Sequence, residues 1–182
     1  MWKIIGGFFG GIVFTGLVAW QMMPGMMFNE KVSPYDMEET IARIQQNIQQ
    51  TGNGWTLTGL RNPAKAIQND GGNVLPVMMV ETCSPKYSKP ILKEDNVRFL
   101  SILMPCKISV YRKSDGKTYI GSMNAGLMGK MFGPVVGEVM GHVAQDQVKF
   151  LTFDPSKPAP KMIEGGGGDG KGGSGGSGGG AC

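Results

Sequence analysis

The sequence predicts an α+β domain, an antiparallel sheet with helices on one face, preceded by one transmembrane helix. Three observations lead to this fold class. The chain opens with an apolar segment, its middle alternates between helical and strand-like apolar spacing, and its end is rich in glycine. We therefore expect a transmembrane anchor (residues 1–28), an α+β domain (29–155) and a Pro-, then Gly/Ser-rich disordered tail (156–182).

The first segment, MWKIIGGFFGGIVFTGLVAWQMMPGMMF, is the predicted anchor. It carries no charge from Ile4 to Met23, and about 20 apolar residues span the ~30 Å hydrocarbon core of a bilayer. Trp2 and Trp20 lie near the two expected interfaces. A cleaved signal peptide is the alternative, but the residues after Leu17 offer no small-x-small cleavage site. We therefore predict an uncleaved, single-pass anchor and a lipid bilayer as partner.

Flanking charges predict the orientation of this anchor. Lys3 and the free amino group lie on one side, whereas Glu30 and Lys31 cancel on the other and acidic residues follow. Positive charge is enriched on the cytoplasmic side of membrane segments. The amino terminus is therefore expected in the cytoplasm and the domain in the periplasm, at a bacterial inner membrane.

The stretch GGFFGG could bring two anchors together. It contains glycine pairs four residues apart, Gly6 with Gly10 and Gly7 with Gly11, and such pairs let membrane helices approach closely. Glycine is also frequent in membrane helices for other reasons, so both interpretations stay open. A homo-oligomer or a membrane-complex partner is expected.

The domain begins and ends with predicted helices. Ser33 can cap the first, Pro34 suits its first turn, and TGNG at 51–54 ends it. Its apolar stripe has helical spacing and consists of Met37, Ile41, Ile44 and Ile48. Helical segments are expected again at 124–132 and 137–151.

Strands are predicted between these helices. The expected strands are 55–58, the run VLPVMMVET at 74–82, 98–103, 107–113 and 118–123. A polar loop is expected over 61–73 and a short helix from Ser84 to Pro90. Asp115-Gly116 is typical of a tight hairpin turn. Helix, strands, hairpin and helix in this order indicate an α+β domain with a largely antiparallel sheet.

Several of these segments together resemble a known family. They are ETIARIQQNIQQTGNGW, VETCSPKYSKPIL and ILMPCKISVYRKSDGKTYIGSMN, followed by a glycine-containing closing helix. From Pro34 to Leu151 the chain resembles domain-of-unknown-function family 302, in a membrane-anchored form with a glycine-rich tail. The resemblance implies a TATA-binding-protein-like arrangement and a tendency to dimerise. The resemblance supplies no catalytic residue. It is also no evidence for DNA binding, because a fold does not fix a function. The sequence pattern of the family has two cysteine positions, and Cys83 and Cys106 occupy them in this chain.

Cys83 and Cys106, each beside a proline, form a candidate thiol pair with three open interpretations. Buried cysteines act as inert small hydrophobes. A periplasmic disulfide would close a loop of about two dozen residues and stabilise the domain by ~3 kcal/mol. A functional dithiol or metal-ligand pair would need exposure and a lowered pKa, and no Cys-x-x-Cys spacing supports it. The third cysteine, Cys182, ends the flexible tail.

Methionine and histidine supply further, weaker candidates for a metal site. Thioether and thiolate ligands suit Cu(I), and MMPGMM places Met22, Met23, Met26 and Met27 at the membrane surface. His142 is the one histidine of the chain. Because most methionines lie in apolar runs, where they fill gaps in a core, we expect no cofactor, with copper as the alternative.

The motifs favour a binding module over an enzyme. The sequence contains no P-loop, dinucleotide fingerprint or Gly-x-Ser-x-Gly elbow. It also lacks the arginine-rich runs, zinc-finger spacing and aromatic motifs of nucleic-acid binders. Basic residues between 83 and 117 indicate a solvated face or, alternatively, contact with anionic lipid or ligand. We therefore predict a periplasm-facing binding or accessory module. The alternative is a thiol-redox or Cu(I)-handling protein that uses Cys83 and Cys106 with methionines.

Overall fold

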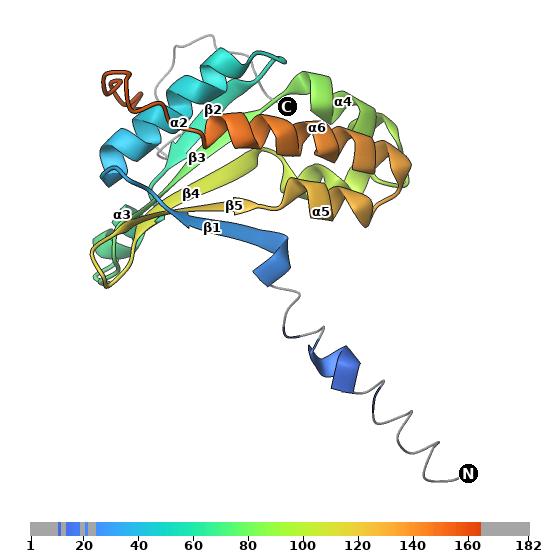
Figure 1. Cartoon of the computed structure of the whole chain (residues 1–182), viewed down its shortest axis with the longest axis horizontal. Helices are drawn as coiled ribbons and strands as arrows, with labels where there is room; N and C mark the ends of the chain where they lie inside the picture. Colours follow the sequence, from blue (N-terminus) through green and yellow to red (C-terminus); the bar gives the residue numbers. More distant parts are fainter. Residues whose placement is uncertain (1–10, 12–13, 19–20, 22–24, 165–182) are drawn as a thin grey trace.

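The computed structural model describes residues 11, 14–18, 21 and 25–164, and shows an α+β fold (Figure 1). Its elements are β1 (Phe28–Val32), α2 (Met37–Thr51), β2 (Thr56–Arg61), α3 (Pro63–Asn69), β3 (Val77–Cys83), α4 (Pro85–Lys93), the 3-10 helix η1 (Arg98–Leu103), β4 (Cys106–Arg112), β5 (Thr118–Met123), α5 (Ala125–Lys130) and α6 (Pro134–Phe150). The five strands form one antiparallel sheet in the order β1-β5-β4-β3-β2. The predicted fold class, α+β with an antiparallel sheet, is confirmed.

The core lies between one face of the sheet and α2. The predicted stripe of α2 faces this core, since Ile41, Ile44 and Ile48 are fully buried. Val80, Ile108, Val110 and Ile120 face them from β3, β4 and β5. Helix α6 packs beside α2 in front of the sheet in Figure 1 and closes the core with Phe150. Burying one such side chain contributes about 1.5–3 kcal/mol, so this layer holds the fold together.

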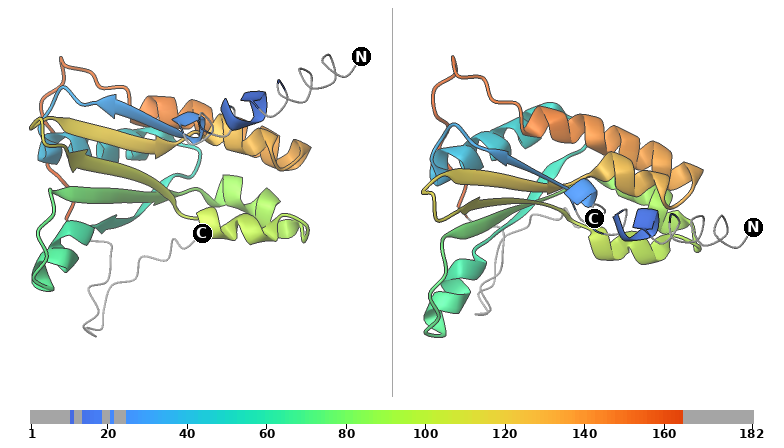
Figure 2. Two further views of the ribbon diagram at one scale, coloured as in Figure 1. Left: turned by 90° about the horizontal axis from the view of Figure 1, so that it is seen from below. Right: turned by 60° about the horizontal axis from the view of Figure 1, so that its bottom comes forward.

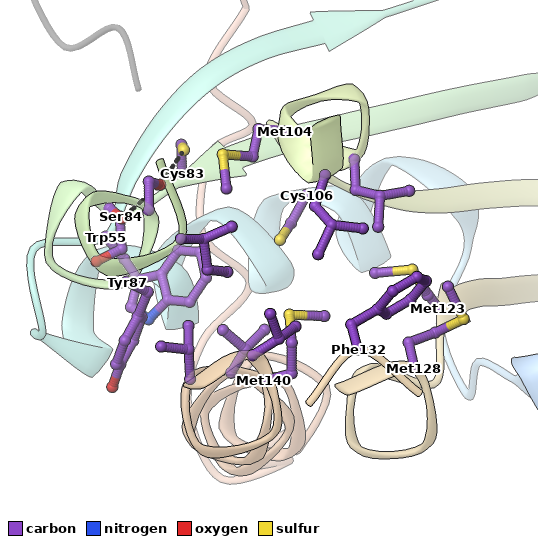
Figure 3. Close-up of a pocket in the computed structure, with 17 residues that line it drawn as sticks. Trp55, Cys83, Ser84, Tyr87, Met104, Cys106, Met123, Met128, Phe132 and Met140 are labelled. Atoms are coloured by element: carbon purple, nitrogen blue, oxygen red, sulfur yellow. Dashed lines mark hydrogen bonds between the residues drawn. The ribbon is translucent and has the colours of Figure 1, made fainter. Parts of the chain in front are cut away.

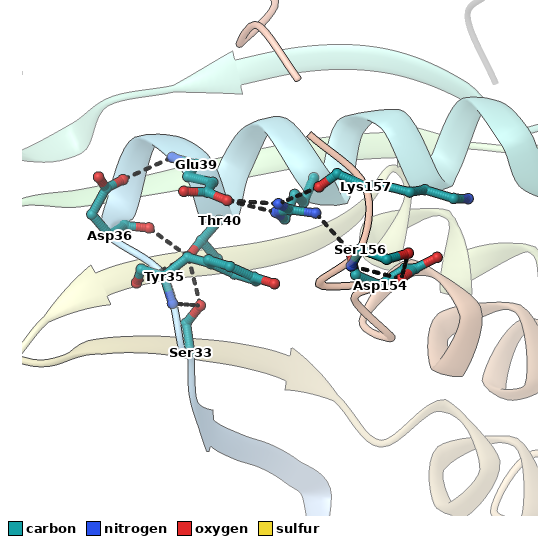
Figure 4. A network of polar contacts seen from close by, with 9 residues as sticks. Ser33, Tyr35, Asp36, Glu39, Thr40, Asp154, Ser156 and Lys157 are labelled. Atoms are coloured by element: carbon teal, nitrogen blue, oxygen red, sulfur yellow. Dashed lines mark hydrogen bonds and ion pairs between the residues drawn. The ribbon is translucent and has the colours of Figure 1, made fainter. Parts of the chain in front are cut away.

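Helix α2 begins later than its sequence suggests. Asp36, and not Ser33, is the N-cap, and its carboxylate accepts a hydrogen bond of 2.9 Å from the Glu39 backbone N–H. The Ser33 hydroxyl lies 2.6 Å from that of Thr40, inside the protein (Figure 4). An aspartate satisfies the free N–H groups of a first turn and also favours the helix dipole.

Polar side chains of α2 hold the segment after α6. The Arg43 guanidinium donates to the carbonyls of Asp154 and Lys157, each at 3.0 Å, and lies over the Tyr35 ring (Figure 4). The Gln45 amide exchanges two hydrogen bonds with the backbone of Ile163. We expected a disordered tail from residue 156, but residues up to Ile163 bind the domain. The remaining tail, 165–182, lies outside the described residues.

Three other segments differ from expectation. Residues 98–103 form η1 and not a strand, because both edges of β3 and of β4 are already paired within the sheet. Helix α3 occupies part of the expected loop at 61–73. Phe28–Val32, which we placed at the junction of anchor and domain, forms the edge strand β1 against β5.

Most of the predicted anchor lies outside the described residues, including Gly6, Gly7, Gly10, Met22 and Met23. Its described parts are helical at 14–18 and 25–27. Within the described part of the chain, no helix is long and apolar enough to cross a membrane.

Two helical arms extend beyond one end of the sheet. One arm, the α4–η1 arm, follows β3, and the other, the α5–α6 arm, follows β5 and consists of α5 with the first turns of α6. Figure 2 shows the two arms as separate layers at the end where the amino-terminal residues leave the domain. The space between them holds the candidate site.

Candidate functional site: an apolar pocket between two arms

The pocket between the arms has a volume of about 40 Å³ (Figure 3). Its walls are almost entirely apolar. They come from the α4–η1 arm (Tyr87, Ser88, Ile91, Leu100, Leu103, Met104), the α5–α6 arm (Met128, Phe132, Val136, Val139, Met140, Val143) and the sheet end (Trp55, Cys83, Ser84, Cys106, Met123). A water molecule needs about 10–15 Å³ and two to four polar partners, so this pocket suits an apolar occupant.

The sheet end brings both predicted cysteines to this pocket. Cys83 is the last residue of β3 and Cys106 the first of β4, where it pairs with Thr82. Pro85 then opens α4, and Pro105 precedes β4 after a cis peptide bond. The prolines thus mark where the strands stop and the arms begin.

Cys106 is a free thiol, and no disulfide joins it to Cys83. The Cys83–Cys106 disulfide that we considered is therefore wrong. Burial raises the pKa of the Cys106 thiol, and the Lys107 ammonium offsets only part of that rise. The thiol is therefore protonated at neutral pH. A reactive cysteine needs the opposite shift, so Cys106 is unsuited to thiol-redox chemistry in this state.

Four thioethers share the pocket with Cys106. Their residues, Met104 just after η1, Met123 of β5, Met128 of α5 and Met140 of α6, point into it (Figure 3). The sequence did not single these methionines out, because each lies in an ordinary apolar run. In the described part of the chain, no group of three or more His, Cys, Asp or Glu side chains could hold a metal.

The other predicted metal candidates do not join the pocket. Met26 is exposed, and its backbone carbonyl accepts a hydrogen bond from the Asn124 amide. The Met27 carbonyl accepts from the Asn124 N–H at 2.8 Å. His142 is exposed on α6 and stacks on Tyr87, with ring centroids 6.1 Å apart.

A buried carboxylate braces the inner wall. Asp146 is 1% exposed, and its Oδ2 accepts from Asn53 at 3.0 Å, from the Trp55 indole at 2.9 Å and from the Tyr87 hydroxyl at 3.0 Å. Lys149 donates to its Oδ1 at 2.6 Å. Burial alone would raise the pKa of Asp146, but these four hydrogen bonds outweigh it and lower the pKa. With four donors around it, the carboxylate serves as a brace and not as a proton-transfer group.

This brace was missed from the sequence. Buried Trp and Tyr side chains usually need a hydrogen-bond acceptor, so Trp55 and Tyr87 gave an indirect indication that one existed. Nothing in the sequence says that the acceptor is Asp146, which lies more than 50 residues from both.

Two aromatic rings meet at the outer end of the arms. Phe132 lines the pocket and meets Phe99 of η1 edge to face, with ring centroids 6.1 Å apart. This contact joins one arm to the other. Phe99 is 60% exposed, whereas Phe132 is partly buried and packs against the core, so the contact lies at the boundary between the core and solvent.

A second, more polar groove runs along the open face of the sheet. It has a volume of about 430 Å³, and Phe28, Ile102 and Lys107 are among its lining residues. Tyr111 and Lys113 both donate to the Glu30 carboxylate there. Burial and this contact raise the pKa of Tyr111 to about 12. The groove therefore holds a neutral phenol and a paired carboxylate, and Cys106 and Lys107 also line it.

The fold and the pocket together define a small α+β module with an apolar cavity and no assembled catalytic group among its described residues. The family model described as "Domain of unknown function DUF302" matches residues 29–152. The chain belongs to this family.

A solved structure agrees with this assignment. The chain is similar to the crystal structure of an uncharacterized conserved protein DUF302 from Bacillus stearothermophilus, with a TM-score of 0.60 and 24% sequence identity. The match covers 69% of this chain and 96% of the other. At this identity the likeness concerns the fold alone. No curated protein matches the chain.

Proposed function

We propose that the chain is a membrane-anchored, non-enzymatic module that binds an apolar ligand between its two arms. The anchor is the segment 1–28, and the domain faces the periplasm. The uncharged run in the sequence supports the anchor, and the balance of flanking charges supports the orientation. The antiparallel sheet with α2 and α6 on one face agrees with the TATA-binding-protein-like arrangement that the family resemblance implies.

The apolar pocket carries the binding proposal. Ligand sites are concave, mostly apolar and supplied with only a few polar groups. Here Ser84, Ser88, Tyr87 and the Cys106 thiol are the polar groups, and Tyr87 is engaged by Asp146. An occupant larger than a few carbon atoms requires the arms to separate, and the exposed Phe99–Phe132 contact is the place where they can do so.

Methionine methyl groups provide the test. We would label the methionine ε-methyls with ¹³C in the full chain in nanodiscs and record their spectra under increasing xenon pressure, because xenon enters dry apolar cavities. We expect the methyl chemical shifts of four pocket residues to change with xenon pressure and then to level off. These residues are Met104, Met123, Met128 and Met140. The methyl of Met79, in the middle of β3 and outside the pocket, should shift little.

A matched pair of variants sharpens this test. Val139→Leu adds a methylene inside the pocket, whereas Val148→Leu adds the same group at a position on α6 that is 66% exposed. We expect xenon binding to weaken severalfold in the first variant and to stay unchanged in the second. Equal, non-saturating shifts at all methionines would contradict the binding proposal.

The cluster of sulfur atoms favours a second candidate, a Cu(I) site. One thiol and four thioethers line the same cavity, and such soft ligands suit Cu(I). Binding would displace the Cys106 proton, so affinity should rise with pH. Competition with a coloured Cu(I) chelator would test this: Cys106→Ser and Met123→Leu should each lose affinity about 10-fold or more, and Met79→Leu should not. A wild-type chain that never competes would exclude this candidate.

We also infer that the chain forms a homo-oligomer through its anchor. The glycine pairs Gly6–Gly10 and Gly7–Gly11 support this, as does the tendency to dimerise that the family resemblance implies. Gly11, the one member described, has open space around its Cα. Gly7→Leu combined with Gly11→Leu should reduce chemical crosslinking in membranes, whereas leucine at position 16, outside both pairs, should not.

A further inference from the structure

The free end of the two arms exposes large apolar side chains. Ile102 is 80% exposed, Phe99 60%, Met131 58% and Val135 42%. Single exposed apolar residues are ordinary, but a contiguous group marks a contact surface. These residues belong to η1, to the end of α5 and to the first turn of α6. We call this group, together with Phe132, the apolar tip.

Contacts between the arms make the tip a single surface. Phe99 of one arm touches Phe132 of the other, and Phe132 adjoins Met131 in the chain. On the other side, Ile102 and Phe28 line the same groove, so the tip continues to the start of β1. Figure 2 shows both arms at this end of the sheet.

The chain enters the domain at this same end. The helical residues 25–27 run directly into β1, without an intervening loop. Asn124 fixes the junction, since its N–H and its amide donate to the carbonyls of Met27 and Met26 at 2.8 and 3.0 Å. The same Asn124 side chain accepts from the Leu127 N–H and caps α5. An anchor that precedes this junction therefore leaves the domain beside the α5–α6 arm.

Charges around the tip suit an anionic surface. The exposed basic residues on the arms and at their bases are Lys86, Lys89, Lys93, Arg98, Lys107 and Lys130, and the exposed acids among them are Glu94, Asp95 and Glu138. Arg98 and Asp95 form an ion pair of 2.7 Å. The surplus is positive, and each cation near an anionic bilayer contributes about 1 kcal/mol of attraction.

We propose that the apolar tip rests in the interfacial layer of the bilayer, with its basic rim among anionic headgroups. This inference builds on the proposed membrane anchor, because the anchor's exit point places the tip at the membrane. Side chains of Phe and Leu type that enter this layer, flanked by Lys or Arg, are typical of interfacial binding. The Phe99–Phe132 mouth of the pocket then opens toward the acyl chains.

Site-specific depth measurement tests the tip directly. We would place an environment-sensitive fluorescent amino acid at position 102 of the full chain and reconstitute it into vesicles of phosphatidylcholine and phosphatidylglycerol, 3 to 1, that carry nitroxide-labelled lipids. The matched control has the same fluorophore at position 67, where Ile67 is 43% exposed on α3, away from the arms (Figure 1). We expect severalfold stronger quenching at 102 than at 67.

A second variant tests cooperation within the tip. With the fluorophore at position 135, the substitutions Phe99→Ser and Ile102→Ser should reduce lipid quenching at least twofold. Both residues are exposed, so near-ultraviolet circular dichroism should show an unchanged fold. Unchanged quenching in this variant would overturn the proposal.

The outcomes separate this inference from the proposed anchor. If the chain floats with the vesicles but quenching at 102 equals that at 67, the anchor stands and the tip proposal is overturned. If position 102 instead crosslinks to a second copy and stays unquenched by lipid, the tip is a protein interface and the proposal is likewise overturned. If the chain does not float with the vesicles, the anchor and the tip proposal both fail, and the xenon experiment still decides on the pocket.

Discussion

The two ends of the domain are built in opposite ways. At one end, which we call the clamped end (α2 with residues 152–163), Arg43, Gln45 and Asn47 bind backbone carbonyls of the closing segment. At the other end, the arms meet through apolar side chains, and at their outer opening the partly exposed rings of Phe99 and Phe132 touch. The clamped end therefore fixes its structure through satisfied hydrogen bonds. The arm end keeps an apolar surface and a pocket available for contact.

Asp146 of α6 joins the residues before β2 to α4 through Asn53, Trp55 and Tyr87, and its loss should have the largest effect. Asp146→Ala leaves the donors of Asn53, Trp55 and Tyr87 without their acceptor inside the protein. Each buried, unsatisfied donor costs about 1–3 kcal/mol, so we expect the free energy of unfolding to fall by about 3 kcal/mol or more in chemical denaturation. Lys149→Ala, which removes an ammonium on a 57% exposed side chain, should cost less than about 1 kcal/mol. Equal losses in the free energy of unfolding in both variants would contradict the role of Asp146 as a brace.

Removal of Arg43 should break the clamped end alone. Arg43→Ala loses two hydrogen bonds to backbone carbonyls, the ion pair with Glu39 and the contact with Tyr35, which we expect to lower the free energy of unfolding by about 2 kcal/mol. Hydrogen exchange should accelerate over residues 154–163 and stay unchanged in η1. Arg61→Ala, at an exposed arginine paired with Glu81, is the matched control. Faster exchange in the arms would show that the two ends are not independent.

Acid should weaken the brace through the same carboxylate. The pKa of Asp146 is lowered in the folded protein, so its contribution is fully present above the unfolded pKa of about 3.9 and is lost as the pH falls through the folded pKa. The melting temperature of the wild type should therefore drop more steeply below about pH 4 than that of Asp146→Asn. Asp154→Asn, at an exposed carboxyl whose pKa is also lowered, by hydrogen bonds from Ser156, should flatten the slope less than Asp146→Asn does. If the melting temperature of Asp146→Asn falls with pH as steeply as that of the wild type, Asp146 is not the source of the acid sensitivity.

At the tip, the smallest effect on stability is expected. Ile102→Ser changes a side chain that is 80% exposed, and such surface changes usually alter stability by less than about 0.5 kcal/mol. Thermal melts in detergent should show this near-neutral effect. A loss comparable to that of Arg43→Ala would mean that the tip contributes to the core, and the contrast between the two ends would disappear.

Local patterns predicted the body of the domain well. The stripe of α2, the Asp115-Gly116 hairpin, β4, β5 and α6 all followed from spacing, because each pattern needs only its own neighbours. RFLSIL at 98–103 was misjudged because a short apolar run does not distinguish a strand from a helix. The secondary structure of this segment depends on which strand edges are already paired within the sheet. β1 was missed because it adjoins a long apolar segment.

The candidate site could be predicted only in part. Cys83 and Cys106 were placed correctly beside prolines where strands end, and the structure brings them to one pocket. The other walls come from Trp55 at one extreme and Val143 at the other, and the tertiary fold alone brings such distant residues together. In the sequence, the four pocket methionines cannot be distinguished from ordinary core methionines. The MMPGMM segment was singled out instead, because its methionines are repeated.

The most direct test of the central claim is native mass spectrometry of the full chain released from bacterial inner membranes. The comparison needs two variants, Val139→Phe inside the pocket and Val148→Phe outside it, both on α6. Our account predicts that the wild type and Val148→Phe carry the same apolar molecule, seen as one mass increment, and that Val139→Phe carries severalfold less of it. Equal occupancy in all three chains, or no retained molecule in any, would contradict the claim that the arms form a binding site.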